Sequence, residues 1–215
     1  MQIPCTSDYN AKRLQDCAVL LGYMISFDPI FTNDGYRPNV GIIICNRKGE
    51  VFWARRINDD GWQFPQGGVG RNEGLIDAMY RELEEETGLA SDQVKIVAHT
   101  KQWLTYDLPP RLLRNQRRRS PTGTRSGRGG KNSKNSNGAK DSEKRVSFKG
   151  QKQVWFLVEL IGDDSMVDLK AGPEQPEFDD WRWVDREHAI SNIVDFKRVV
   201  YQQAMNELEP FLPNG

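Results

Sequence analysis

Cysteine is scarce in this chain of 215 residues, which contains only Cys5, Cys17 and Cys45. They include no C-x-x-C pair, and neither His99 nor His188 lies at zinc-ligand spacing from them. An odd number of scattered cysteines argues against a disulfide framework and favours a reducing compartment. We therefore predict a cytoplasmic protein whose fold depends on its hydrophobic core.

Long hydrophobic runs are also absent. The longest uncharged apolar stretch, residues 17–27, is too short to cross a bilayer. Asp16 stands directly before it and no small-residue cleavage site follows, so the stretch lacks the pattern of a signal peptide. We expect no membrane partner. Mean hydropathy is low at −0.69, yet six tryptophans and nine phenylalanines indicate a folded core.

The chain has no overall excess of charge, because 30 Lys and Arg residues balance 30 Asp and Glu residues. The charges are nevertheless separated along the sequence. Residues 111–150 contain 13 basic and 2 acidic residues, a net charge of +11, so the remainder carries −11. Such asymmetry suggests a polyanionic partner.

The centre of this basic stretch, residues 117–147, is dense in Gly, Ser, Asn, Lys and Arg. It cannot bury enough apolar surface to offset its ordering entropy, so we predict a disordered insert between two strands. Two interpretations stay open: a solvated loop, or an arm that grasps RNA. Residues 1–32 are expected to form a weakly structured extension with a short helix near residues 12–21. Residues 33–215 then form the folded domain.

Apolar periodicity predicts the elements of this domain. Strands at 40–46 and 51–57 form a hairpin around a turn at 47–50, followed by a Gly-rich loop over 58–68. A helix over 73–87 is closed by Gly88, and an amphipathic helix over 194–212 is stopped by Pro213. One or two strands are expected over 94–108, one over 150–162 and a short aromatic strand over 178–184. The tryptophans assigned to the core are Trp62, Trp103, Trp155, Trp181 and Trp183.

The predicted helix over 73–87 carries three glutamates, Glu82, Glu85 and Glu86, at spacings that place them on one face. On a helical wheel they lie beside the apolar stripe, where partial shelter from water strengthens their repulsion. A divalent cation such as Mg²⁺, which binds carboxylate oxygens and substrate phosphates, would relieve it. Taken alone, the stretch is also compatible with a solvated acidic helix face.

Residues 67–89 meet every fixed position of the pattern G-x₅-E-x₇-R-E-U-x-E-E-x-G-U, in which the last two glutamates are Glu85 and Glu86. This resembles the Nudix box, the signature of hydrolases that cleave a nucleoside diphosphate linked to another group. The resemblance implies that Glu82, Glu85 and Glu86 bind divalent cations and that a glutamate acts as general base toward water. Arg81 is expected to hold neighbouring carboxylates in position, Glu73 among them.

The resemblance extends over about residues 34–115 and 148–212, to the bacterial RNA 5′-pyrophosphohydrolases of the Nudix superfamily. The matching segments are GYRPNVGIIICNRKGEVFWARR, WQFPQGG, AMYRELEEETGL, WLTYDLP, GQKQVWFL, PEFDDWRWV and FKRVVYQQAM. It implies an α/β fold, an α/β/α sandwich with a mixed sheet in which the box forms a loop-helix-loop. It also implies Mg²⁺-dependent removal of pyrophosphate or phosphate from the 5′ end of transcripts, which leaves 5′-monophosphate RNA that is open to decay.

Further metal ligands are implied by the same resemblance. Glu177 matches a metal-binding glutamate from outside the box, although it could also be an ordinary loop acid beside Pro176. The carbonyl of Gly67 matches a backbone metal ligand. The expected cofactor is Mg²⁺, with Mn²⁺ or Zn²⁺ as substitutes.

The resemblance also implies substrate-binding residues for 5′-triphosphorylated or diphosphorylated RNA. Arg37 and Arg56 match basic residues near the 5′ phosphates and first bases, while Tyr106, Phe196 and Lys197 match residues that line the RNA site. Aromatic faces and Arg planes stack unpaired bases, and Lys meets phosphate. For the two aromatic residues, plain core packing is the alternative.

Two other functions stay open on the sequence. Hydrolysis of dinucleoside polyphosphates such as diadenosine tetraphosphate uses nearly the same box and a similar YRPNVG start. A non-catalytic Nudix-fold regulator that binds RNA is the other, against which the intact glutamates argue. Because nothing required for hydrolysis precedes Met24, a chain that starts there is expected to fold and to keep its activity.

Overall fold

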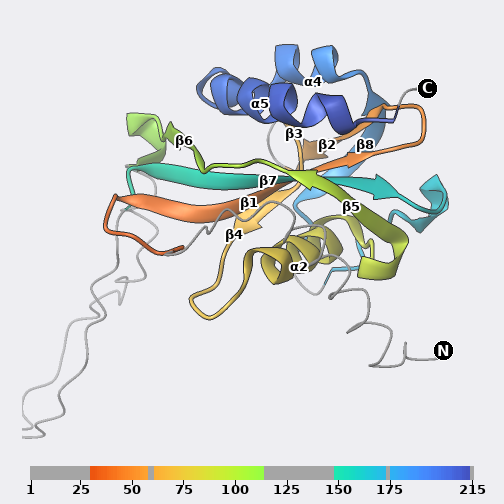
Figure 1. Ribbon diagram of the computed structural model, residues 1–215, viewed down its shortest axis with the longest axis horizontal. Helices are drawn as coiled ribbons and strands as arrows, with labels where there is room; N and C mark the ends of the chain where they lie inside the picture. The colour runs from red at the N-terminus through yellow and green to blue at the C-terminus, as the bar shows by residue number, and fades with distance from the viewer. Residues whose placement is uncertain (1–29, 58–60, 114–147, 173–174, 214–215) are drawn as a thin grey trace, which may run out of the picture.

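The computed structural model describes residues 30–57, 61–113, 148–172 and 175–213. The predicted helix near residues 12–21, the start at Met24 and the basic insert at 117–147 lie outside these residues. Within them, a mixed sheet lies between helix α2 on one face and helices α4 and α5 on the other (Figure 1). This arrangement confirms the predicted α/β/α sandwich.

The middle layer is an eight-stranded sheet with the central order β3-β2-β1-β7-β5. Strand β4 pairs with β1, β6 with β7, and β8 with β2. β1 and β7 run parallel along the whole of β1, whereas the other pairs are antiparallel. The strands are β1 Tyr36–Cys45, β2 Val51–Arg56, β3 Trp62–Gln63, β4 Gln66–Gly68, β5 Val94–His99, β6 Leu104–Asp107, β7 Gly150–Leu160 and β8 Phe178–Val184.

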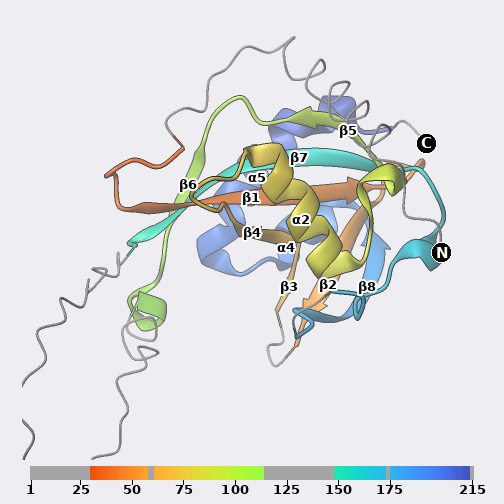
Figure 2. The same ribbon diagram turned by 90° about the horizontal axis from the view of Figure 1, so that it is seen from below.

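The outer layers are helical. α2 (Leu75–Thr87) crosses one face of the sheet, which Figure 2 shows from below. α4 (Arg186–Asn192) and α5 (Asp195–Leu208) cover the other face. Short 3₁₀ turns occupy Ser91–Gln93, Asp164–Met166 and Glu209–Phe211. Within the described ranges, no helix has both the length and the apolar character that crossing a membrane would require.

The two central strands are buried on both faces, which explains their continuous apolar runs. Because successive side chains of a strand point to opposite faces, Ile42 and Ile44 pack on the α2 side while Ile43 packs on the α5 side. On β7, Phe156 and Trp155 divide in the same way. The chain therefore has two hydrophobic cores, one on each side of a shared sheet.

The predicted hairpin and loop are corrected in part. The turn is present, with Gly49 at a φ of +78°, but β1 pairs with β2 only at Cys45 and Val51. β4 takes the same edge of β1 further along, at Asn39–Gly41. Residues 58–68, which we predicted to be loop, therefore contain both β3 and β4. Their Gly-rich sequence has little intrinsic preference for strand, so the pairing comes from tertiary context.

The helix boundaries also differ from the prediction. α2 begins at Leu75 rather than Glu73, and it ends as predicted before Gly88, whose φ is +73°. α5 ends at Leu208 and gives way to a 3₁₀ turn at Pro210, so the prediction that it runs to 212 is wrong. Proline has no backbone N–H and clashes with the preceding turn, which ends the helix. The seven-residue helix α4 was not predicted, because so short an element shows little periodicity.

The tryptophans occupy the core and its edges. Trp155 is fully buried as predicted, and so is Trp53, which the prediction omitted. The other four are only partly buried and pack against the rims of the two cores. Trp62, for example, lies 4.3 Å from the guanidinium carbon of Arg182, measured to its ring centroid. Large aromatic side chains often cover the edge of a core in this way.

Candidate active site

A pocket of about 370 Å³ lies where β1, β4, β6 and β7 meet the α2 glutamates and the start of α5. Nine of the predicted residues line it: Arg37, Arg56, Gly67, Glu82, Glu86, Tyr106, Glu177, Phe196 and Lys197. The remaining four predicted residues do not line it: Glu73, Arg81, Glu85 and Gly88. The fold thus brings together side chains that are up to 160 positions apart, from Arg37 to Lys197.

Glu82 lies directly against the backbone of β4. A Cβ atom added at Gly67 would overlap the carboxyl group of Glu82, so glycine is required for this close approach. Burial raises the pKa of Glu82, an ion pair with Arg81 opposes that rise, and repulsion from Glu85 adds to it. Glu82 is therefore a carboxylate whose negative charge is costly in the protein alone.

Glu86 is the most deeply buried of the three glutamates, with 9% of its surface exposed. Its Oε2 accepts a hydrogen bond of 3.0 Å from the backbone N–H of Gln66. Burial raises the pKa of Glu86 well above its ordinary value, and repulsion from Glu177 and Glu82 raises it further. The Gln66 hydrogen bond and the charge of Lys197 only partly offset these effects.

Arg81 connects four parts of the site behind the pocket. Its Nε and Nη2 donate to the Glu73 carboxylate at 2.7 and 2.9 Å, which is the contact that the sequence predicts. Nη1 donates to Glu82 at 2.6 Å and to Glu85 at 3.0 Å, and Nη2 also reaches the Gly68 carbonyl at 2.8 Å. The hydrogen bond from Arg81 lowers the pKa of Glu73 although partial burial opposes this. A planar guanidinium can make all these contacts at once, whereas an ammonium cannot.

The donor chemistry of the pocket fits a hard divalent cation. In the part of the chain that the structure describes, no three acidic, histidine or cysteine side chains already converge as metal ligands. Arg81 instead contacts Glu82 and Glu85. The raised pKa values of Glu82 and Glu86 nevertheless mark a sheltered carboxylate cluster that a cation would stabilise.

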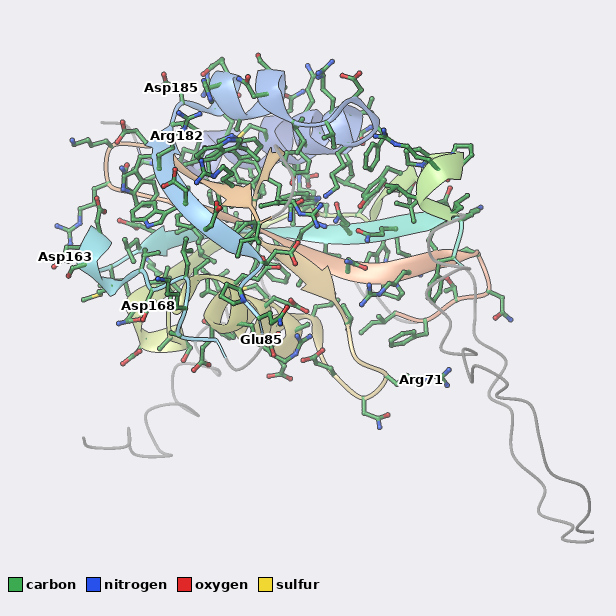
Figure 3. The ribbon with its side chains drawn as sticks, turned by 180° about the vertical axis from the view of Figure 1, so that it is seen from behind. Arg71, Glu85, Asp163, Asp168, Arg182 and Asp185 are labelled. Atoms are coloured by element: carbon green, nitrogen blue, oxygen red, sulfur yellow. The ribbon has the colours of Figure 1, made fainter. Side chains whose placement is uncertain are left out.

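Glu85 stands apart from the other predicted ligands. Figure 3 shows it projecting from α2 below the sheet, and its side chain is 32% exposed where it pairs with Arg81. A role for Glu85 at the metal therefore needs a rotation of its side chain toward the pocket.

Cationic side chains face this carboxylate cluster. Arg56 Nε donates to Glu177 Oε1 at 3.1 Å. Arg37 packs over Gly68, where an added Cβ would overlap its guanidinium. Lys197 is 7% exposed, and its Nζ donates to Gln63 Oε1 at 2.9 Å. A pocket that holds both carboxylates and cationic side chains suits a phosphate chain that is bridged to a metal ion.

Tyr106 and Phe196 pack in or against the core and also line the pocket. Tyr106 is 7% exposed and belongs to the core on the α5 side, against which Phe196 also packs. Their ring centroids are 5.8 Å apart, and both line the pocket. Tyr106 OH donates to Gln151 Oε1 at 2.6 Å. Core packing thus fixes the orientation of rings whose edges border the site.

Side-chain amides form a part of the pocket that our sequence reasoning missed. Asn39, Gln63, Gln66 and Gln151 all line it. A signal was available on β1, where Arg37 and Asn39 are polar side chains two positions apart just before an apolar run, and both line the pocket. Alternation of this kind marks one face of a strand, and here it marks the face that borders the pocket.

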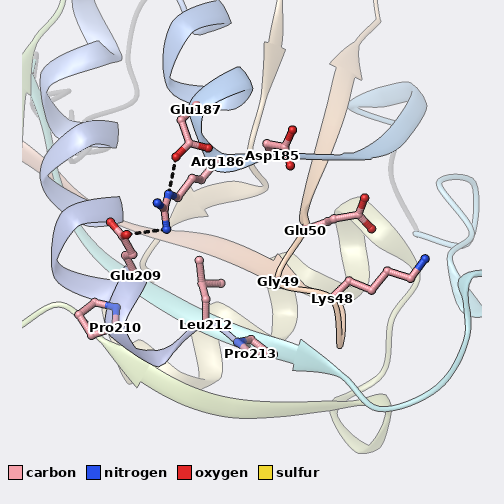
Figure 4. Close-up of a pocket in the computed structure, with 10 residues that line it drawn as sticks. All are labelled: Lys48, Gly49, Glu50, Asp185, Arg186, Glu187, Glu209, Pro210, Leu212 and Pro213. Carbon is pink, nitrogen blue, oxygen red and sulfur yellow. Dashed lines mark hydrogen bonds and ion pairs between the residues drawn. The ribbon is translucent and has the colours of Figure 1, made fainter. Parts of the chain in front are cut away.

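A second pocket of about 470 Å³ lies between the β1–β2 turn, the start of α4 and the 3₁₀ turn after α5 (Figure 4). None of the predicted site residues lines it. Arg186 bridges two elements there, with Nε 2.7 Å from Glu187 and Nη1 2.5 Å from Glu209. Because this pocket contains none of the predicted site residues, we assign the chemistry to the pocket beside α2.

Comparisons with known proteins agree with this geometry. Residues 35–204 match the NUDIX domain family. The chain is 46% identical over 184 residues to the RNA pyrophosphohydrolase of Alkalilimnicola ehrlichii, which covers 85% of this chain and 86% of that protein. It is 44% identical over 181 residues to the RNA pyrophosphohydrolase of Haemophilus ducreyi, covering 84% and 78%. The E. coli dihydroneopterin triphosphate pyrophosphohydrolase structure shares the fold, with a TM-score of 0.53, 16% identity and coverage of 80% and 99%.

Proposed function

The chain belongs to the NUDIX family, and on that premise we propose that it is an RNA pyrophosphohydrolase. It hydrolyses the 5′-terminal polyphosphate of RNA, releases pyrophosphate or phosphate and leaves a 5′-monophosphate end. Because its substrates are transcripts, we place it in the cytoplasm. Its relatives of about 45% identity over more than four-fifths of the chain support the substrate class.

One observation carries the chemistry of this proposal. Glu82, Glu86 and Glu177 line the same pocket as the fixed cations of Arg37, Arg56 and Lys197. A polyphosphate needs cations along its length, and the attacking water needs a metal ion or base beside the phosphorus. Few other ligand classes require both kinds of group in one pocket.

The glutamates are proposed to hold a divalent cation, Mg²⁺ first and Mn²⁺ or Zn²⁺ as substitutes. Glu82, Glu86 and Glu177 would supply carboxylate oxygens, with Gly67 as the backbone ligand and Glu85 joining after its side chain rotates. When bound, such an ion withdraws charge from phosphoryl oxygens and acidifies a bound water. One of the box glutamates accepts the proton of the attacking water.

The other residues bind and position. Arg37, Arg56 and Lys197 neutralise the phosphates, while Tyr106 and Phe196 border the first bases. Arg81 acts through the carboxylates that it holds and is a positioning residue. Its contact with Gly68 keeps β4 against the middle of α2, next to Glu82.

The test is a comparison of substrates with the purified protein in Mg²⁺. We expect kcat/KM to be higher for short 5′-triphosphorylated RNA than for diadenosine tetraphosphate, and chelation of the metal to abolish both reactions. A preference for diadenosine tetraphosphate would assign the chain to the dinucleoside polyphosphate hydrolases instead. Tight binding of RNA without any hydrolysis would indicate a regulator.

The cationic side of the pocket is tested separately. Arg37→Gln is expected to lower kcat/KM on triphosphorylated RNA by about tenfold or more, because it removes a charged hydrogen bond to phosphate. Arg71→Gln is the matched control, since Arg71 is exposed on the loop before α2 and points away from the protein (Figure 3). Equal losses in the two variants would show that Arg37 acts only through general charge.

A further inference from the structure

Asn39 is a buried amide with no role in the chemistry described above. It lies on β1 between Pro38 and Val40 and lines the active-site pocket, yet only 2% of its surface is exposed. Its Oδ1 is buried and accepts no hydrogen bond from any residue that the structure describes. A buried amide oxygen without a partner is destabilising, so in a native protein it calls for an explanation.

The neighbouring amides already have partners. Gln63 and Gln66 accept hydrogen bonds from Lys197 at 2.9 and 3.2 Å, and Gln151 accepts one from Tyr106. Among the pocket-lining amides in the described ranges, Asn39 is therefore the one whose oxygen has no hydrogen-bond partner. Gln153, the parallel neighbour of Asn39 on β7, also has an unpaired oxygen but is 0% exposed and does not line the pocket.

Register places Asn39 beside the part of the pocket that holds Glu82 and Arg37. Asn39 pairs with Gly68 of β4, and the Glu82 carboxyl group lies against the adjacent residue, Gly67. Arg37, two positions earlier on the same strand, lies on the same face. A substrate whose phosphates lie between Glu82 and Arg37 would bring its first sugar within reach of this part of the floor.

The chemistry of an amide selects a neutral partner. Phosphates at neutral pH offer no hydrogen-bond donor, and the pocket already presents three cations to them. An unpaired amide oxygen needs a hydrogen-bond donor. A ribose 2′-hydroxyl is such a donor, and every nucleotide of RNA has one whatever its base.

We propose that Asn39 hydrogen-bonds the 2′-hydroxyl of the first nucleotide and so distinguishes RNA ends from DNA ends. This inference rests on the proposed function and refines its substrate class. A site built to bind a hydroxyl rejects the analogue that lacks it, because its own polar group is then left buried and unpaired. Asn39 would thus be a specificity-determining residue that contacts substrate.

The experiment measures kcat/KM for two proteins on two substrates in Mg²⁺. The substrates are a 5′-triphosphorylated oligoribonucleotide and the same molecule with a 2′-deoxy first nucleotide. We expect wild-type protein to prefer the ribonucleotide by about tenfold, the effect of one good hydrogen bond. Asn39→Leu, and Asn39→Ala as a second variant, should show a preference below about twofold, because they can no longer pair with the hydroxyl.

The melting temperature provides a second readout, and the control is a variant that should lower it without changing the ribose preference. Asn39→Leu removes an unsatisfied buried polar group and keeps the same branched heavy-atom skeleton, so the melting temperature should stay the same or rise. Thr100 is 0% exposed and lies outside the pocket, and its Oγ1 accepts from the Trp155 N–H at 3.1 Å. Thr100→Val should lower the melting temperature while the ribose preference stays at its wild-type value.

The following results would overturn the assignment of Asn39 to the ribose 2′-hydroxyl. An unchanged ribose preference in both Asn39 variants, or no preference in the wild type, would show that Asn39 does not contact the 2′-hydroxyl. Weaker inhibition by inorganic tripolyphosphate in Asn39→Leu would indicate a phosphate contact, and altered preference among first bases would indicate a base contact. Wild-type protein that cleaves neither oligonucleotide would reject the proposed function itself, and this inference with it.

Discussion

At the scale of single residues, the active site depends on small groups that allow large ones to come close. Gly67 lets the Glu82 carboxylate lie on the backbone of β4, and the Gln66 N–H holds Glu86 at 3.0 Å. Both glutamates have a pKa that burial raises. Their position is therefore unfavourable for stability, and this is typical of side chains that are kept for chemistry.

Removing the charge of a glutamate on α2 tests whether these side chains lower stability but support hydrolysis. We expect Glu86→Gln to reduce hydrolysis of triphosphorylated RNA by roughly two orders of magnitude or more, because metal binding and proton transfer contribute effects of that size. Glu85→Gln should do the same if its side chain rotates to the metal. In metal-free buffer the melting temperature of Glu86→Gln should not fall, since a costly buried charge is removed.

The control for both variants is Glu84→Gln on the same helix. Glu84 is exposed and should keep nearly full activity. Steady-state kinetics in Mg²⁺ and thermal melting in a chelator provide the measurements. Activity within about threefold of wild type in both Glu85→Gln and Glu86→Gln would be incompatible with a metal site on α2.

At the scale of elements, the end of α2 is set by Gly88. Its φ of +73° is in the left-handed region, and its N–H bonds to the Glu84 carbonyl at 2.9 Å. A Cβ there would lie 2.5 Å from the carbonyl oxygen of Asp168. Gly88→Ala should therefore lower the free energy of unfolding by about 2 kcal/mol or more, from backbone strain and overpacking together.

The variant Gly88→Asn separates the two causes. Asparagine tolerates the left-handed region better than alanine, but it carries the same Cβ. If the clash with Asp168 dominates, urea unfolding should show similar losses for both variants. If strain dominates, Asn should recover most of the stability. Wild-type stability in the Ala variant would contradict the geometry of this helix end.

A second link between elements ties residues 32–34 to β7. Lys152 is 3% exposed, and its Nζ donates to Thr32 Oγ1 at 2.7 Å and to Asp34 Oδ2 at 3.1 Å. Burial would raise the pKa of Asp34, but hydrogen bonds from Thr32, the Tyr36 N–H and Lys152 outweigh it and lower the pKa to about 2. Because the folded pKa is below the unfolded value of about 3.9, this link stabilises the protein above about pH 4.

The expected pH dependence of stability follows from the lowered pKa of Asp34. The stabilisation should disappear as the pH falls from about 4 toward 2, because the unfolded state binds a proton before the folded state does. Urea unfolding of wild type and Asp34→Asn should thus differ by a constant amount above about pH 4, and the two should converge at lower pH. Asp195→Asn, at a side chain that is 90% exposed, should differ little from wild type at any pH. A difference for Asp34→Asn that grows on acidification would reverse the sign and refute the link.

At the scale of the whole molecule, the basic segment lies between two strands that pair directly. Asp107 at the end of β6 is the register partner of Gly150 at the start of β7, and Leu108 N–H bonds to the Lys149 carbonyl at 2.9 Å. Residues 117–147 lie outside the described ranges, and we propose that they form an insert into one Nudix domain. The two ends of the connection are held together by the sheet, so its length is not needed to close the fold.

Deleting residues 117–147 should therefore change stability little, because the entropy of closing a loop depends weakly on its length. If the segment contacts RNA, its Lys and Arg displace counterions, and the deletion should flatten the slope of log K against log salt for a long transcript. Hydrolysis of a triphosphorylated dinucleotide should be unchanged, since the glutamates and Arg37 that line the pocket remain. Fluorescence titrations across a salt series measure the slope. Equal slopes for both proteins would favour the solvated-loop interpretation, whereas loss of folding would contradict the insert.

The sequence by itself determined what depends on local pattern. The spacing of Glu82, Glu85 and Glu86 on one helix face follows from 3.6 residues per turn, and the end of α2 follows from Gly88. The apolar runs of β1 and β7 indicate strands that are buried on both faces. Arg81 could be assigned to Glu73 because both lie within the same short motif. These features involve neighbours in the chain, so the sequence carries them directly.

Only the tertiary structure decided which distant residues share the pocket. The parallel pairing of β1 with β7 places Asn39 next to Gln153, 114 positions later. The short strands β3 and β4 exist because neighbouring strands offer them hydrogen bonds, and Glu85 faces Arg81 rather than the pocket. A shift of one residue in register would turn Asn39 to the opposite face of the sheet. Register depends on the packing of both cores at once, which no local pattern in the sequence specifies.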